Sequence, residues 1–150
     1  METHKRSFKL INDISELKTL NQQLYAFGKT IGLPKSFIVE INICLDELFT
    51  NIVSYGYEDN LEHPIFFTFC LNDDELTIEV EDEGVPFNPL GVKKPEKIND
   101  LENTPIGGLG IYIVKELMDN ICYKRYRSKN NLTLKKCIIA DKFFLLYQAA

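Results

Sequence analysis

Hydrophobic and polar positions recur along this chain with two spacings, and each spacing predicts a different kind of element. Spacings of three and four residues predict helices from about Ser15 to Ile31, from about Pro34 to Tyr55 and from Gly108 to about Met118. Alternation with a period of two predicts strands at Ser7–Ile11, Ile65–Leu71, Leu76–Glu81, Ile121–Arg127 and Leu132–Ile139. Turns are expected at Asn72–Asp74 and Lys129–Asn131, where short polar side chains gather.

One segment follows neither spacing. Residues 83–106 hold four prolines, at positions 86, 89, 95 and 105, and read as a long loop. Loops of this length inside a compact domain are uncommon unless they serve a function. With 150 residues and no internal repeat, the chain is interpreted as one domain spanning 1–150, with a core of about 8–139. An apolar extension at 141–150 is expected to cover the sheet edge or to pack against a partner.

Composition and charge narrow the class of protein. The chain is 45% hydrophobic and 26% charged, which is typical of a folded domain, and no apolar run approaches the roughly 18–20 residues of a membrane span. The formal charge is −5, so a nucleic-acid partner is not expected. Residues 124–150 hold seven of the 17 basic side chains and form either a solvated strand face or a docking patch for an acidic protein.

The cysteines bear on location. Cys44, Cys70, Cys122 and Cys137 stand singly and form no CxxC pair, which favours reduced thiols over a disulfide or zinc site. The polar N-terminus does not look like a secretory signal. A cytoplasmic location is therefore expected.

The second helix carries the first candidate site. Glu47 and Asn51 lie one turn apart, at the border between the apolar and the polar side of that helix. A carboxylate and an amide oxygen in this arrangement could hold Mg²⁺ and leave the carboxylate free to accept a proton. An ordinary polar helix edge has the same appearance, so both interpretations stay open at this point.

Asp82 is the second candidate. It follows Leu76, Ile78 and Val80 in the alternation, which directs its carboxylate to the core face, and Gly84 comes two residues later. A buried carboxylate needs hydrogen-bond donors, and the exocyclic amine of a purine would be a fitting one. If the strand ended one residue earlier, Asp82 would instead be a turn residue.

The third candidate is the glycine-rich segment Gly107–Gly110, where the long loop ends and a helix begins. Backbone N–H groups at a helix start attract anions such as phosphate, although the segment could also be a plain hinge. The glycine spacing matches neither GxxxxGK[ST] nor GxGxxG.

In combination, these motifs resemble the GHKL family of ATP-binding domains, and the closest similarity is to the bacterial anti-sigma factor serine kinases. DELFTNIVSYGYED resembles the N-box of that family, EDEGVPFNP its first glycine box and GGLGIYIVKELMD its second. The resemblance covers about residues 8–139. It implies an α/β two-layer sandwich, with one mixed, mostly antiparallel sheet and its helices on one face. The other face is expected to be exposed or to pair with a second copy as a homodimer.

The resemblance also implies roles for individual residues. Glu47 would be the catalytic base, and Asn51 would coordinate the Mg²⁺ that bridges the ATP phosphates. Asp82 and Gly84 would hold the adenine. Gly108, Leu109 and Gly110 would offer backbone to the phosphates, with Gly107 as the hinge. Residues 88–106 would be the lid over ATP, with lysines at 93, 94 and 97.

The implied function is that of an ATP-dependent protein serine kinase and anti-sigma factor. Such a protein phosphorylates an anti-anti-sigma partner of the STAS type and sequesters a sigma factor. Three alternatives remain open: an ATP-binding partner-switching module without kinase activity, the catalytic fragment of a histidine kinase, and a degenerate scaffold. The histidine-kinase alternative is disfavoured because neither His4 nor His63 lies in a helical hairpin pattern.

Overall fold

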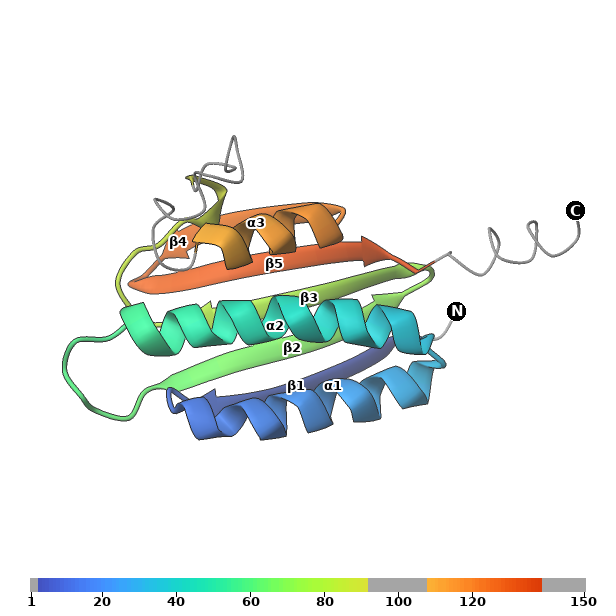
Figure 1. Cartoon of the computed structure of the whole chain (residues 1–150), viewed down its shortest axis with the longest axis horizontal. Helices are drawn as coiled ribbons and strands as arrows, with labels where there is room; N and C mark the ends of the chain where they lie inside the picture. Colours follow the sequence, from blue (N-terminus) through green and yellow to red (C-terminus); the bar gives the residue numbers. More distant parts are fainter. Residues whose placement is uncertain (1–2, 92–107, 139–150) are drawn as a thin grey trace, which may run out of the picture.

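The computed structural model describes residues 3–91 and 108–138. Along the chain the described elements are β1 (His4–Ile11), α1 (Leu17–Ile31), α2 (Lys35–Tyr55), β2 (Pro64–Asn72), β3 (Glu75–Asp82), α3 (Gly108–Leu117), β4 (Asn120–Tyr126) and β5 (Lys129–Cys137). Single 3₁₀ turns at Ile14–Glu16 and Pro89–Gly91 precede α1 and follow β3. Figure 1 shows the three helices running roughly along the strands of one sheet.

The limits of the helices follow from local chemistry. Asp13 has extended backbone, and its carboxylate accepts a hydrogen bond from the backbone N–H of Ser15, which satisfies a donor at the start of the first helical turn. Gly32 ends α1 with a φ of 70°, a left-handed conformation that glycine adopts without steric cost. Pro34 is the N-cap residue directly before α2, where its missing N–H removes no helical hydrogen bond.

The sheet has the order β1-β2-β3-β5-β4, and all four pairings are antiparallel. The sheet was predicted to be mixed and mostly antiparallel; the described strands form a purely antiparallel sheet, so the mixed part of that prediction is wrong for them. The physical reason is the position of β5. The crossover through α3 brings β4 back in the direction of β3, but the β4–β5 hairpin places β5 between these two parallel strands, so they do not pair.

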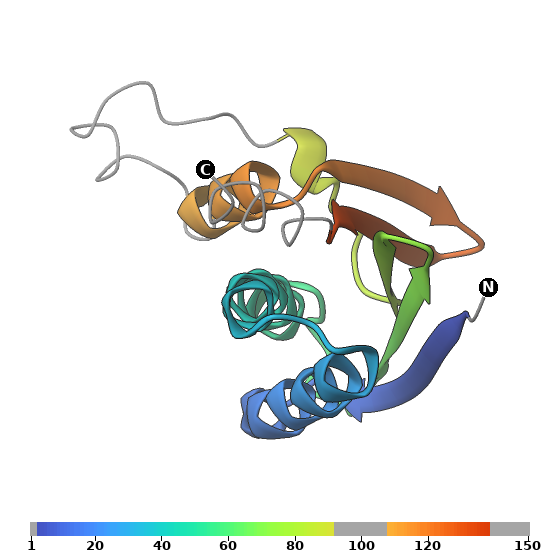
Figure 2. The same ribbon diagram turned by 90° about the vertical axis from the view of Figure 1, so that its right-hand side faces the viewer.

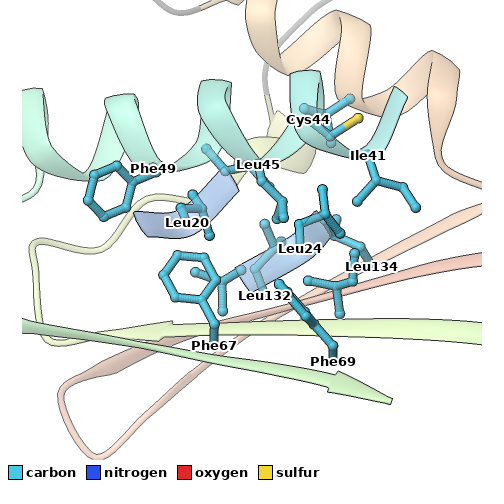
Figure 3. Close-up of a cluster of buried hydrophobic side chains, with 14 of the residues drawn as sticks. Leu20, Leu24, Ile41, Cys44, Leu45, Phe49, Phe67, Phe69, Leu132 and Leu134 are labelled. Atoms are coloured by element: carbon cyan, nitrogen blue, oxygen red, sulfur yellow. The ribbon is translucent and has the colours of Figure 1, made fainter. Parts of the chain in front are cut away.

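All three helices cover one face of the sheet, and the other face carries no described helix (Figure 2). The core lies between the two layers, as the cluster in Figure 3 illustrates. Leu45 and Phe49 of α2 meet Phe67 and Phe69 of β2 there, and all four side chains are essentially inaccessible to solvent. The predicted sandwich with helices on one side is confirmed.

Several strand bounds differ from the sequence prediction, and the following differences are the most important for the site or the largest. β1 begins at His4 rather than Ser7, and β3 includes Asp82. The turn between β4 and β5 lies at Arg127 and Ser128, both with positive φ, instead of at residues 129–131. β5 consequently begins at Lys129 and contains Asn130.

All four cysteines are free thiols. Among the described helices, none combines the length and the apolar character needed to cross a bilayer. The extension at 141–150 lies outside the described residues.

Candidate functional site

Glu47 and Asn51 lie on the C-terminal half of α2, one turn apart and both partly buried. The amide nitrogen Nδ2 of Asn51 is buried and has no hydrogen-bond partner among the residues that the structure describes. A buried polar atom without a partner is uncommon in folded proteins and costs free energy unless a ligand, an ion or water satisfies it. The amide of Asn51 is therefore a candidate binding group.

The first turn of α3 packs against Glu47. A Cβ built on Gly110 would collide with the carboxylate of Glu47 and would lie 2.7 Å from its Cδ. Only a residue without a side chain permits this approach. The glycine-rich start of α3 and the Glu47–Asn51 pair of α2, separated by about sixty residues in the sequence, are thus brought together.

Asp82 is the last residue of β3 and is 5% exposed, on the same face of the sheet as Leu76, Ile78 and Val80. Its Oδ1 accepts hydrogen bonds from the backbone N–H of Gly84 at 2.8 Å and from Nδ2 of Asn130 at 3.0 Å. Burial raises the pKa of Asp82 above its ordinary value, whereas the hydrogen bonds from Asn130 and Gly84 and the charge of Arg125 oppose that rise. The alternative in which the strand ends one residue earlier and Asp82 is a turn residue is wrong, because β3 includes Asp82.

The turn after Asp82 docks on the end of α2. The N–H of Val85 donates to the carbonyl oxygen of Gly56 at 2.8 Å, and a Cβ on Gly84 would lie 2.6 Å from that same oxygen. Gly56 directly follows the last residue of α2, five positions after Asn51. Since a helix rises about 1.5 Å per residue, Asn51 lies within about 8 Å along the helix axis of the place where the Asp82–Gly84 turn is anchored.

Sequence reasoning missed Tyr57. Its hydroxyl oxygen accepts a hydrogen bond from the N–H of Glu83 at 3.0 Å, so Tyr57 provides a second anchor for the same turn. Its ring stacks on His63 at 4.2 Å, and burial raises the pKa of Tyr57 to about 12. No pattern in the sequence singles out this residue, because its contact depends on the tertiary packing of two distant segments.

Asn130 was also missed. It is 7% exposed and lies directly opposite Asp82 on β5. A signal for it existed: extending the alternation of Leu132 and Leu134 back by two residues places Asn130 on the core face. Assigning residues 129–131 to a turn hid that continuation.

The predicted site residues divide into three groups. Glu47 lies against Gly110, Asn51 follows one turn later on α2, and Asp82 and Gly84 are anchored at the end of the same helix. Gly108 and Leu109 belong to the first turn of α3. Gly107, the greater part of the predicted lid, and the lysines at 93, 94 and 97 lie outside the described residues.

The donor set fits a magnesium–nucleotide complex better than a resident metal centre. No group of three or more His, Cys, Asp or Glu side chains within 3–91 and 108–138 is arranged to hold a metal ion. Mg²⁺ commonly takes one or two protein oxygens and completes its shell with phosphates and water. Asn51 fits this use, because turning its amide to present the oxygen breaks no hydrogen bond of Nδ2.

Three features together define an ATPase-type domain. They are the carboxylate–amide pair on α2, the buried aspartate at the end of β3 and the glycine-rich start of α3, in a fold whose helices cover one face of the sheet. The model of the histidine kinase-like ATPase domain family matches residues 11–136. The chain belongs to this family.

Serine-protein kinases named RsbW are among its relatives. The chain is 36% identical to that of Bacillus cereus (strain ATCC 10987) and 38% identical to that of Bacillus mycoides (strain KBAB4), each over 95 residues. Each match covers 61% of this chain and 59% of the relative, so the chain spans only part of the length of the curated proteins it matches.

Solved structures show the same fold. The RsbU and RsbW domains of a Mycobacterium tuberculosis protein match with a TM-score of 0.66 at 18% identity, over 90% of this chain and 32% of that one. A chain of the SiaB–SiaC complex of Pseudomonas aeruginosa matches with a TM-score of 0.57 at 13% identity, over 89% of this chain and 89% of that one. At these identities the likeness concerns the fold alone.

Proposed function

We propose that this chain is an ATP- and Mg²⁺-dependent protein serine kinase that also acts as an anti-sigma factor. The observation that carries the proposal is the packing of α3 and of the turn after β3 against α2, the helix that holds Glu47 and Asn51. Gly110 of α3 lies against Glu47, Nδ2 of Asn51 is buried with no hydrogen-bond partner in the described part of the chain, and Gly84 contacts Gly56 at the helix end. The family match and the similarity to RsbW serine-protein kinases support the same function.

In this proposal the two ends of the site have different tasks. Asp82 accepts a hydrogen bond from the exocyclic amine of adenine. Gly84 belongs to the same end of the site, and its lack of a side chain lets the turn pack against the carbonyl oxygen of Gly56. The N–H groups at the start of α3, from Gly108 to Gly110, face the phosphates with the favourable end of the helix dipole. The roles proposed for Gly107 as a hinge and for residues 88–106 as a lid follow from the resemblance of the motifs alone.

Glu47 is the proposed base for phosphoryl transfer. A serine hydroxyl oxygen of the protein substrate forms a bond to the γ-phosphorus, and the bond between that phosphorus and the bridging oxygen breaks. ADP leaves with the electron pair, and the serine proton passes to the carboxylate of Glu47. Mg²⁺, held by Asn51, would neutralise phosphate charge. Positioning supplies most of the acceleration in such reactions, so a rigid placement of Glu47 is what the site needs.

The proposed partners follow from the RsbW relatives and the resemblance of the motifs. They are an anti-anti-sigma protein of the STAS type, which is the substrate, and a sigma factor that the chain sequesters. The proposal includes a cytoplasmic location and pairing of two copies through the uncovered sheet face.

The direct test is transfer of labelled phosphate. The whole chain is incubated with γ-labelled ATP, Mg²⁺ and STAS-domain proteins from the same organism, and phosphoserine is measured. Glu47→Gln keeps the shape of the side chain against Gly110 but removes its basicity. We expect phosphoserine formation to fall by a factor of about 10²–10⁴ while ATP binding persists, since general-base catalysis contributes about that much.

Asp46→Asn is the matched control. It makes the same chemical change one residue away, where Asp46 lies beside Asn21 of α1 once that amide is oriented to satisfy its neighbours. Its phosphoserine yield should equal that of the unmodified chain. Bound ATP without any phosphoserine would contradict the kinase and favour an ATP-binding partner-switching module. Lack of ATP binding, with and without Mg²⁺, would exclude both.

A further inference from the structure

Asn130 makes more hydrogen bonds than any other side chain around Asp82. Its Nδ2 donates to Oδ1 of Asp82 at 3.0 Å, to the carbonyl oxygen of Val85 at 2.9 Å and to that of Gly84 at 3.4 Å. Its Oδ1 accepts from the hydroxyl of Tyr123 at 2.5 Å and from the N–H of Phe87 at 3.4 Å. One amide thus joins β3, the turn after it and the β4–β5 hairpin.

These contacts fix the orientation of the amide. Nδ2 faces three oxygen acceptors, so a flipped amide would bring oxygen against oxygen at each of them. Oδ1 faces a backbone N–H, which can only donate. The hydroxyl of Tyr123, a further donor to Oδ1, stabilises the same orientation. Since Asn130 is nearly fully buried, water does not compete effectively for these bonds.

The consequence appears at the carboxylate of Asp82. Both of its hydrogen bonds within the described residues, from Gly84 and from Asn130, end on Oδ1. The second oxygen, Oδ2, accepts none from residues 3–91 or 108–138. Arg125 donates to the carbonyl oxygen of Gly84 at 2.7 Å and holds the turn from the β4 side. The carboxylate therefore has one oxygen held and one oxygen left for a ligand.

We propose that Asn130 is a positioning residue that sets the base preference of the site, by holding Oδ1 of Asp82 so that Oδ2 meets the 6-amino group of adenine. This inference rests on the proposed ATP site. An amino group donates to a fixed carboxylate oxygen, whereas the 6-oxo group of hypoxanthine is an acceptor and would face it unfavourably. Without this restraint the carboxylate of Asp82 would rotate, and the site would discriminate less between adenine and hypoxanthine.

The test compares ATP with inosine triphosphate, which carries oxygen in place of the 6-amino group. Dissociation constants of both nucleotides are measured by calorimetry with Mg²⁺ on the unmodified chain and on Asn130→Ala. We expect the unmodified chain to prefer ATP. In Asn130→Ala the affinity for ATP should fall roughly ten- to one-hundredfold, as for the loss of a hydrogen bond to a charged group, while that for inosine triphosphate stays within about threefold.

Asn131→Ala is the matched control, because it makes the same substitution at the neighbouring asparagine. The side chain of Asn131 lies on the other face of the sheet and donates to Oε1 of Glu79 at 2.6 Å. Both affinities should be unchanged. Tyr123→Phe provides a second variant that keeps the ring and removes only the hydroxyl bond to Asn130. It should reduce the preference for ATP by about threefold or more.

Equal losses for both nucleotides in Asn130→Ala would mean a merely structural role and would overturn the inference, as would an unchanged preference. If Asn130→Ala does not fold, as judged by circular dichroism, Tyr123→Phe decides, and an unchanged preference in that variant overturns the inference. An unmodified chain that binds neither nucleotide contradicts the proposed function itself. An unmodified chain that binds ATP, with an unaltered preference in the variants, contradicts only the role of Asn130.

Discussion

At the scale of single residues, Gly84 and Gly110 both allow close approach, but they approach different kinds of atoms. A Cβ on Gly84 would meet a backbone oxygen, that of Gly56, which cannot move without displacing the end of α2. A Cβ on Gly110 would meet the end of the Glu47 side chain, which can rotate away. The same substitution should therefore damage stability at one position and activity at the other.

We predict that Gly84→Ala lowers the free energy of unfolding by about 1–3 kcal/mol, the usual cost of overpacking. Gly110→Ala should leave it unchanged or raise it by up to about 1 kcal/mol, because alanine favours a helix, while phosphoserine formation falls at least tenfold. Urea unfolding and the phosphorylation assay measure the two effects. The difference between the positions would be refuted by equal losses of stability in both variants.

Asp82 links the site to pH. Its pKa is raised by burial, so the folded chain holds the proton at pH values where the unfolded chain has released it. Between the unfolded pKa, near 3.8, and the raised folded pKa, the folded state binds more protons, and stability falls as the pH rises. At neutral pH the charged carboxylate therefore has a net cost to folding.

Asp82→Asn should remove that cost and keep an oxygen for Asn130 and Gly84. We predict that Tm at pH 7 rises relative to the unmodified chain, that the gain shrinks as the pH is lowered toward 4, and that ATP binding is lost. Calorimetric scans from pH 4 to 7 measure this. A gain that is the same at every pH would show that titration of Asp82 is not its source.

At the scale of elements, the β4–β5 hairpin has an unusual turn. Arg127 and Ser128 have φ values of 49° and 64°, although two-residue hairpins with positive φ at both positions favour Asn-Gly. The left-handed conformation costs a residue with a side chain about 1–2 kcal/mol. The long pairing of β5 with β3 and β4 imposes this turn against local preference.

Ser128→Gly should therefore stabilise the protein by about 0.5–1 kcal/mol, since glycine adopts this conformation without strain but loses more freedom on folding. The midpoint of urea unfolding checks the prediction. Ser128→Ala is the control and should give no gain, because its Cβ keeps the strain. A lower midpoint in Ser128→Gly would contradict the explanation.

The same hairpin explains what the sequence could and could not predict. All three helices and all five strands lie within a few residues of their predicted places, because each has a clear hydrophobic period. Asp82 was located by that period as well. Asn130 was not, because Lys129-Asn130-Asn131 has the composition of a turn, and only pairing with β3 shows it to be strand. Tyr57 and Gly56 contact residues more than twenty-five positions away, which no local pattern encodes.

At the scale of the whole molecule, the proposed nucleotide would join elements from both halves of the chain. Adenine would meet β3 and, through Asn130, β5, while the phosphates would lie between α2 and α3. A ligand that binds only the folded state stabilises it by about 2.7 kcal/mol at one hundred times its dissociation constant. Loading the site should therefore raise the unfolding temperature of the entire domain.

We predict a rise in Tm of about 5–10 °C for the unmodified chain at that excess of ATP with Mg²⁺, since about 1 kcal/mol corresponds to about 2–4 °C at this size. Asn51→Ala should retain a smaller shift, and Asp82→Asn should show almost none. Differential scanning fluorimetry measures all three. A full rise in Tm in Asp82→Asn would contradict the proposed contact between Asp82 and adenine.

The strand that comes last among those described, β5, occupies an interior position in the sheet, between β3 and β4. A nascent or prematurely terminated polypeptide that stops before residue 129 would already contain Glu47, Asn51 and Asp82 but would lack the amide that seats the aspartate. Such fragments should not bind nucleotide. Synthesis must thus extend through β5 before the proposed site can bind nucleotide.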